Sequence, residues 1–358
     1  MALTAVNTLI SHGYKVVLFV NKALNLKRLE KMLGRNMLSE AELIVKNTFI
    51  PPRDTLDVYP STVRSLCLKM RCDILIDTYS NCVFPWTDIS YIHYPFLSLF
   101  PKSRFPYAES ICVSRALVLP YAFIEKNFRK YDTKLVLANS RFTAEAIKRF
   151  LGARAEVLYP PVSSKFLCRS EELNENFREN LVVTVSPFGF RKGLEKIPYI
   201  AKLCDKSVKF VIIGLLHNEE VFQLLQQYIK KLGLTERVTV ALNLSKDDVI
   251  EYLKKARIYL HTMVGEHFGI SIVEAMGMGC IPIVHDSGGA KEFVPSNFRY
   301  SDIFDAAHKI NKFIFEWTPE MARQMIGIAE QFSEENFSRE FMKLFLRYKN
   351  ERNQRCGR

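Results

Sequence analysis

The chain has 358 residues, of which 48% are hydrophobic and 25% charged, and it carries a formal net charge of +12. This composition excludes an intrinsically disordered protein, and the length accommodates two domains with apolar cores. The excess of positive charge suits an anionic partner: a nucleic acid, an anionic membrane surface or a substrate that carries a diphosphate.

The eight cysteines do not organise the fold, because the chain has no Cys-x-x-Cys pair and no cysteine–histidine spacing typical of a metal site. We interpret them as reduced core residues of a cytoplasmic protein. No run of about 18 or more apolar residues occurs, so no membrane-spanning helix is expected. Lysine and arginine are scattered rather than clustered, which argues against a nucleic-acid partner.

The first half of the chain opens with a helix and continues with short apolar strands. Apolar residues at helical spacing from Leu3 to Ile10 predict the helix, and Gly13 ends it. Strands are then predicted at 16–20, 43–45, 74–76, 89–92 and 135–138. A doubly wound half normally begins with a strand and a Gly-rich turn, so its first strand is missing here. We expect that residues precede Met1; the alternative is a domain that has lost this strand.

Polar residues follow two of these strands. His93 comes directly after strand 89–92, and Arg141 lies just beyond strand 135–138, where Ser140 is the expected helix N-cap. Open parallel sheets bind ligands at the carboxyl ends of their strands, so His93 and Arg141 are candidate site residues. The structural alternative for His93 is a histidine whose hydrogen bonds are made within the protein. For the turn that holds Arg141, the alternative is a simple helix cap.

Residues 103–128 form an apolar, aromatic stretch surrounded by cations. The cations are Arg104, Arg115, Lys126, Arg129 and Lys130. An apolar face rimmed with positive charge suits peripheral docking on an anionic membrane. A core helix broken at Pro120 explains the same pattern equally well, and both interpretations stay open.

Two consecutive prolines, Pro160 and Pro161, divide the chain, because proline interrupts both helices and sheets. We place one domain at 1–160 and a second at 161–334. Strands of the second half are predicted at 181–185, 210–214, 238–240, 258–260 and 281–284, and helices at 321–330 and 338–347. Near-continuous apolar strands between helices imply an α/β fold with parallel sheets covered on both faces.

A basic turn follows the first strand of the second half. Arg191 and Lys192 lie there, just before Gly193 and a predicted helix. Two cations at this place can offset the charge of a diphosphate without a metal ion, and the chain has no Asp-x-Asp motif. A solvated surface turn is the structural alternative.

The most informative segment begins at Glu266. Glu266 and Glu274 stand eight residues apart, and His-Phe-Gly follows the first of them. A strand is predicted upstream and a helix starts at about Ile270, so 266–269 form a strand-to-helix loop. The N–H groups of such a helix start suit a phosphate, and Glu274, about one turn further, can reach a sugar hydroxyl. Two solvated glutamates beside a buried helix are the alternative.

This segment resembles the signature of the family 4 retaining glycosyltransferases, in which Phe-Gly follows the first glutamate of a Glu-x7-Glu pair. The likeness continues through 279–284 and 287–289, and in weaker form covers the chain from about Gly13 to its C-terminal helices. It implies a GT-B fold: two Rossmann-like domains with parallel sheets facing a central cleft, and a last helix, here 335–358, that crosses back onto the first domain. It also implies a hexosyltransferase that needs no cofactor or metal.

The resemblance assigns roles to individual residues. Glu266 would contact the transferred sugar and stabilise its positive anomeric carbon, and His93 would face the same sugar. The residues that would bind the nucleotide-sugar donor are Arg141, Arg191, Lys192, Gly269, Ile270 and, on the ribose hydroxyls, Glu274. The family's usual arginine, five residues before the lysine, is Pro187 in this chain, so Arg191 is expected to replace it.

Three blocks, at 91–95, 266–270 and 285–289, are most similar to the mannosyltransferases of this family that extend lipid-linked glycans. They imply mannose transfer from GDP-mannose to a glycan or polyprenyl-linked acceptor, as in N-glycosylation, on the cytoplasmic face of a membrane. A UDP-sugar is the alternative donor. A GT-B nucleotide-sugar epimerase and a non-catalytic or truncated nucleotide-sugar-binding protein are the alternatives from other functional classes.

Overall fold

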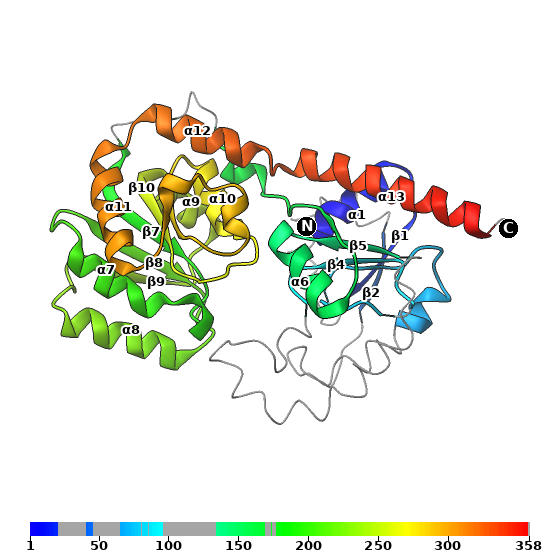
Figure 1. The fold of residues 1–358 in the computed structure, drawn as a ribbon, viewed down its shortest axis with the longest axis horizontal. Helices are drawn as coiled ribbons and strands as arrows, with labels where there is room; N and C mark the ends of the chain where they lie inside the picture. Colours follow the sequence, from blue (N-terminus) through cyan, green and yellow to red (C-terminus); the bar gives the residue numbers. More distant parts are fainter. Residues whose placement is uncertain are drawn as a thin grey trace. The chain divides into compact units, whose positions relative to one another are not determined.

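The computed structural model describes residues 1–20, 41–45, 65–79, 81–84, 86–95, 134–168, 173 and 177–356. The chain divides into two compact units, whose elements are labelled in Figure 1. Unit 1 comprises Met1–Pro161 and Glu334–Arg358, and unit 2 comprises Val162–Ser333. The segment 103–128 lies outside the described residues, so its two interpretations stay predictions. No described helix is both long and apolar enough to cross a bilayer.

The described part of unit 1 contains two parallel sheets. Helix α1 (Ala2–Ser11) precedes β1 (Val16–Val20) and β2 (Ala41–Val45), which pair with each other. The second sheet has the order β3-β4-β5-β6, formed by Ile76–Asp77, Ile89–Ile92, Leu135–Ala138 and Glu156–Val157. A doubly wound sheet places its leading strand between the second and fourth strands of the sequence. The two sheets of unit 1 separate at this place, and no strand among the described residues joins them.

Helix α13 (Glu334–Cys356) belongs to the core of unit 1, and Figure 1 shows it beside α1. Buried apolar residues of α13, α1, β4 and β5 share one cluster: Phe337, Phe341, Phe345, Tyr348, Ala5, Leu9, Ile89, Tyr91, Leu135 and Leu137. Tyr348 Oη donates to Asp88 Oδ1 at 3.1 Å, and Lys69 Nζ pairs with Asp88 Oδ2 at 2.5 Å. Removing α13 would therefore expose much of this core to water.

Unit 2 is built on one six-stranded parallel sheet with the order β12-β11-β10-β7-β8-β9. Its strands are β7 (Glu179–Val185), β8 (Lys209–Gly214), β9 (Val238–Leu242), β10 (Ala256–His261), β11 (Ile281–His285) and β12 (Arg299–Tyr300). The central strands are almost entirely buried, as expected for a parallel sheet covered on both faces. The predicted strands of this half all occur, and the two-residue β12 is additional.

The sequence supplies side-chain caps for several helices of unit 2, although not for all of them. The helices of this unit include α7 (Ile197–Leu203), α8 (Glu219–Lys231), α9 (Lys246–Lys255), α10 (Ile270–Gly277), α11 (Ile303–Glu316) and α12 (Pro319–Glu330). Asn218 caps α8, Ser245 and Asp248 form a capping box on α9, and Asp302 caps α11. Helix α10, which follows the Glu266 loop, has no side-chain cap.

Unit 2 starts and ends at neighbouring residues. The N–H of Val162 donates to the carbonyl of Phe332 at 2.8 Å, and Val162 forms a parallel bridge with Ser333. The chain therefore leaves unit 1 and returns to it at adjacent positions, and unit 2 is an insertion within the sequence of unit 1.

Candidate functional site

Loops after three neighbouring strands form the candidate site of unit 2. Strand β10 lies between β7 and β11 in the sheet. The turn 190–192 follows β7, the loop 262–269 follows β10, and residues 286–289 follow β11. Because the carboxyl ends of parallel strands share one sheet edge, these loops meet there, where open α/β sheets bind ligands.

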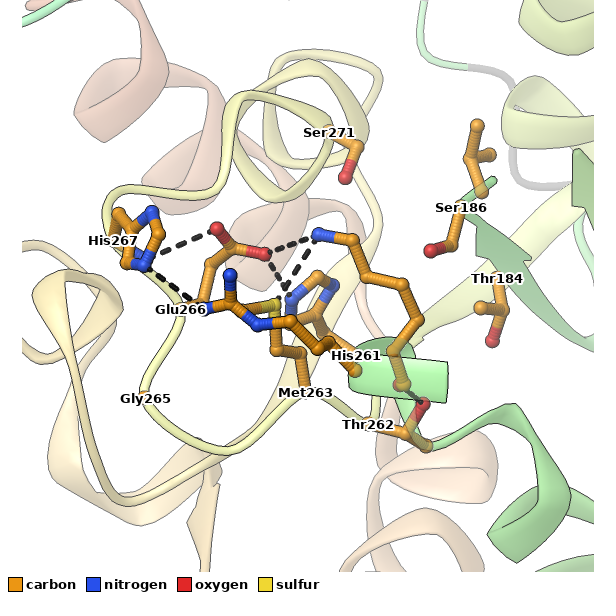
Figure 2. Close-up of polar contacts among 12 residues, drawn as sticks. Thr184, Ser186, His261, Thr262, Met263, Gly265, Glu266, His267 and Ser271 are labelled. Carbon is orange, nitrogen blue, oxygen red and sulfur yellow. Dashed lines mark hydrogen bonds and ion pairs between the residues drawn. The ribbon is translucent and has the colours of Figure 1, made fainter. Parts of the chain in front are cut away.

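The carboxylate of Glu266 is the centre of the polar contacts in Figure 2. Its Oε2 accepts hydrogen bonds from Lys192 Nζ and His261 Nε2, each at 3.0 Å, and its Oε1 accepts the N–H of His267 at 3.0 Å. Burial alone would raise the pKa of Glu266, but the hydrogen bonds and charges of His261 and Lys192 outweigh it and hold the pKa well below its usual range. Glu266 is therefore a carboxylate at neutral pH.

The two cations predicted to hold a diphosphate both lie beside the Glu266 loop. Besides Glu266, Lys192 Nζ approaches Met263 Sδ at 3.2 Å, and its backbone carbonyl accepts a hydrogen bond from Thr262 Oγ1 at 2.7 Å. Arg191 Nη2 lies 3.3 Å from His267 Nε2. The structure thus brings Arg191, Lys192 and Glu266 together. The strand order of the sheet accounts for this, because Glu266 is far from the two cations in the sequence.

Two glycines allow the loops to approach this closely. A Cβ on Gly288 would lie 2.2 Å from the carbonyl oxygen of Glu266, an oxygen that accepts the N–H of Gly289 at 2.7 Å. Gly269 has φ +95°, a backbone conformation that side chains with a Cβ rarely adopt, and it is the N-cap residue of α10. The loop after β11 therefore fixes the Glu266 loop, and Ile270 opens α10 with backbone N–H groups available to an anion.

Glu274 lies one turn into α10, in a different environment from Glu266. Burial raises the pKa of Glu274 to about 7, which the charge of Lys246 only partly offsets. Among the described residues, none donates a hydrogen bond to this carboxyl. A buried carboxyl without a hydrogen-bond donor is costly to ionise. Hydroxyl groups of a ligand that supply the missing hydrogen bonds would stabilise it.

Glu274→Gln is expected to stabilise the unliganded protein at about pH 8 and to change its stability little at about pH 5. The native pKa of about 7 lies above the ordinary value of 4.5, so ionisation costs native stability as the pH rises between these values. The full cost is about 3 kcal/mol, or about 5 °C in melting temperature. Thermal unfolding at both pH values measures it, with exposed Glu220→Gln in α8 as the control. Equal melting-temperature changes at both pH values would contradict this assignment.

The predicted site residues of unit 1 lie at one edge of its four-stranded sheet. His93 follows β4; its N–H donates to Asn81 Oδ1 at 2.8 Å, and its Nε2 lies 3.3 Å from the carbonyl oxygen of Thr78. Burial lowers the pKa of His93. Arg141 opens α6 (Arg141–Leu151), which Ser140 caps as predicted. The roles of His93 and Arg141 stay predictions.

His261 was not predicted as a site residue. The predicted strand 258–260 ends just before it, yet it is the residue that donates to Glu266 from the end of β10. A histidine at the carboxyl end of an otherwise apolar strand, five residues before a candidate catalytic glutamate, was the available signal. Within the described ranges, no three His, Cys, Asp or Glu side chains are grouped to hold a metal ion.

Comparison with known families identifies the domain that holds this site. Residues 169–332 match the family described as Glycosyl transferases group 1. Unit 2 is a group 1 glycosyl transferase domain. The match confirms the resemblance seen in the sequence from the Glu266 segment.

Curated relatives are mannosyltransferases. The chain is 26% identical to the GDP-Man:Man(3)GlcNAc(2)-PP-Dol alpha-1,2-mannosyltransferase of Dictyostelium discoideum, over 71% of this chain and 57% of the relative. It is 31% identical to the Homo sapiens protein of the same name, over 56% of this chain and 46% of the relative. The chain thus spans about half the length of the curated relatives it matches.

Solved structures with a similar fold align with most of the length of this chain. Anabaena Alr3699/HepE, in complex with UDP and glucose, aligns with a TM-score of 0.68 at 18% identity, over 96% of this chain and 95% of that one. Sucrose-phosphate synthase from Thermosynechococcus elongatus aligns with a TM-score of 0.72 at 16% identity, over 97% and 91%. The predicted GT-B class, with two Rossmann-like domains built on parallel sheets, is confirmed.

Proposed function

We propose that the protein is a retaining glycosyltransferase that moves mannose from GDP-mannose to a glycan carried on a polyprenyl diphosphate. The observation that carries the proposal is the ion pair between Lys192 Nζ and Glu266 Oε2, 3.0 Å long, with the Glu266 side chain only 12% exposed, at the ligand-binding sheet edge of a group 1 domain. The name of the relatives supports the choice of donor and acceptor. We place the reaction at the cytoplasmic face of a membrane, where such an acceptor lipid resides.

In the proposed reaction, unit 2 holds the donor. Lys192 and Arg191 offset the charge of the diphosphate, together with the N–H groups at the start of α10. The Glu274 carboxyl forms hydrogen bonds with the ribose hydroxyls, which supply the partners that it lacks among the described residues. Because these groups neutralise the diphosphate, the proposal requires neither a metal ion nor a cofactor.

The transfer step uses the charge of Glu266. As the bond between the anomeric carbon and the diphosphate breaks, positive charge develops on the sugar, and the Glu266 carboxylate stabilises it through space. The acceptor hydroxyl bonds to the anomeric carbon on the face that the diphosphate leaves. Its proton passes to an oxygen of the departing phosphate, so the proposal assigns no side chain as the base.

Thermal stabilisation by nucleotides tests the donor. GDP and GDP-mannose at about 100 times their dissociation constants are expected to stabilise the native protein by about 2.7 kcal/mol, a rise of several degrees. UDP and UDP-glucose at the same concentrations are expected to give no shift. A shift with uridine nucleotides alone would replace GDP-mannose by a UDP-sugar, and no shift with any of the four would overturn the proposed function.

Product analysis then separates transfer from the alternatives. With GDP-mannose and a lipid-linked glycan, a transferase releases GDP and forms an extended glycan in equal amounts, also in the presence of EDTA. An epimerase would convert the donor without an acceptor, and a non-catalytic binding protein would leave it intact.

A further inference from the structure

His261 occupies a fixed and buried position at the end of β10. Its side chain is 4% exposed, and its backbone pairs with Val284 of β11. Tyr300 Oη donates to its carbonyl oxygen at 3.1 Å, and its ring stacks near that of Tyr259. The imidazole is therefore held by the sheet rather than by a movable loop.

The polar contact of this ring runs to Glu266. Nε2 lies 3.0 Å from Glu266 Oε2, and because an ionised carboxylate can only accept, the proton of this bond belongs to Nε2. Nδ1 is buried and has no hydrogen-bond partner among the described residues. The ring thus has one polar contact in the described part of the chain. An apolar side chain at this position could fill the same space, but it could not donate a hydrogen bond to Glu266.

Lys192 and His261 share the same oxygen of Glu266. Lys192 reaches Oε2 on a long side chain that is 26% exposed, whereas His261 reaches it from within the sheet. In the proposed reaction, Lys192 turns part of its charge toward the donor diphosphate. His261 is then the donor that stays on Oε2, while the N–H of His267 stays on Oε1.

We infer that His261 is a positioning residue for Glu266: its Nε2–H keeps the carboxylate ionised and directed at the sugar while Lys192 engages the diphosphate. The inference rests on the proposed function for the identity of the reaction. The hydrogen bond itself, and its effect on Glu266, can be measured without a substrate. The charged or titratable groups near this pair among the described residues include Lys192, Arg191, His267, Tyr259 and Tyr300.

Two substitutions separate hydrogen bonding from proton transfer and from packing. His261→Gln places an amide N–H close to the position of Nε2, and His261→Leu fills the space without a donor. His261→Leu is expected to lower kcat about 10- to 100-fold with donor KM changed less than about threefold, while His261→Gln retains kcat within about threefold. Full activity of His261→Leu would overturn the inference, and so would equal loss in both variants.

A carboxyl titration tests the inference independently of turnover. The ¹³C signal of the Glu266 carboxyl, assigned with Glu266→Gln, is followed against pH in the donor-free protein. His261→Leu is expected to raise the pKa of Glu266 by about one pH unit or more, and His261→Gln to leave it near the wild-type value. An unchanged titration in His261→Leu would overturn the inference.

Thr184→Val is the matched control. Thr184 is buried on neighbouring β7, and its Oγ1 donates to the carbonyl of Leu260 at 2.8 Å, so the variant removes a buried hydrogen bond next to His261 without touching Glu266. It is expected to leave the titration and kcat unchanged. If the wild type transfers no sugar from any donor, the proposed function fails, yet the titration still decides whether His261 controls Glu266.

Discussion

Glu266→Gln is expected to lower the rate of sugar transfer about 1,000-fold while GDP affinity changes less than about threefold. Glutamine keeps the shape of the side chain and an oxygen for the hydrogen bonds from Lys192 and His261, but it lacks the negative charge that is proposed to face the anomeric carbon. Single-turnover transfer and nucleotide titration measure the two quantities separately. Glu266→Ala is expected to lose transfer in the same way.

Glu274→Gln is the matched comparison for this prediction. Glu274 lies on α10 and is assigned to the ribose. The variant is therefore expected to weaken donor binding, and to change the rate of sugar transfer from bound donor far less. An active Glu266→Gln variant, or one whose loss of activity is explained by loss of GDP binding, would remove Glu266 from the transfer step.

Lys192→Met is expected to lower kcat/KM for the donor about 100- to 1,000-fold and to abolish most of the stabilisation by GDP. Methionine keeps the length of the side chain but removes the charge assigned to the diphosphate. The variant also removes one of the groups that hold the pKa of Glu266 low. Since Glu266 is proposed to act as a carboxylate, the acidic limit of activity is expected to move to higher pH.

Arg191→Met tests whether this effect is particular to Lys192. Arg191 contacts His267 rather than Glu266, so its loss is expected to cost about tenfold in kcat/KM and to leave the acidic limit in place. Steady-state rates across the pH range compare the two variants. Identical pH profiles would show that Lys192 does not act on Glu266.

Local patterns in the sequence were enough to predict most strands and helices. The apolar runs at 16–20, 89–92 and 135–138 coincide with β1, β4 and β5. The two-residue strands β6 and β12 were missed because periodicity needs a longer segment. Helix α13 extends beyond 338–347, the range predicted from apolar spacing, because its later residues are mostly polar or charged and give no apolar pattern. Only the resemblance implied a longer last helix, at 335–358.

The site was predictable only where neighbouring residues carried the signal. The Glu-x7-Glu spacing and the Lys-Gly pair each lie within a short segment, and both were found. The contact between Lys192 and Glu266 joins residues 74 positions apart, because β7 and β10 are neighbours in the sheet although β8 and β9 separate them in the sequence. The role of His261 depends on the same strand order, which explains why it was overlooked.

The placement of α13 has a consequence for synthesis on the ribosome. Unit 2 is complete before residues 334–356 are made, whereas the core of unit 1 includes Phe337 and Phe341 and joins Thr8 to Ser338, 330 residues away. Unit 2 can therefore fold while unit 1, which is made first, still exposes apolar surface that α13 will cover. Unit 1 is thus begun first during synthesis but completes its core last.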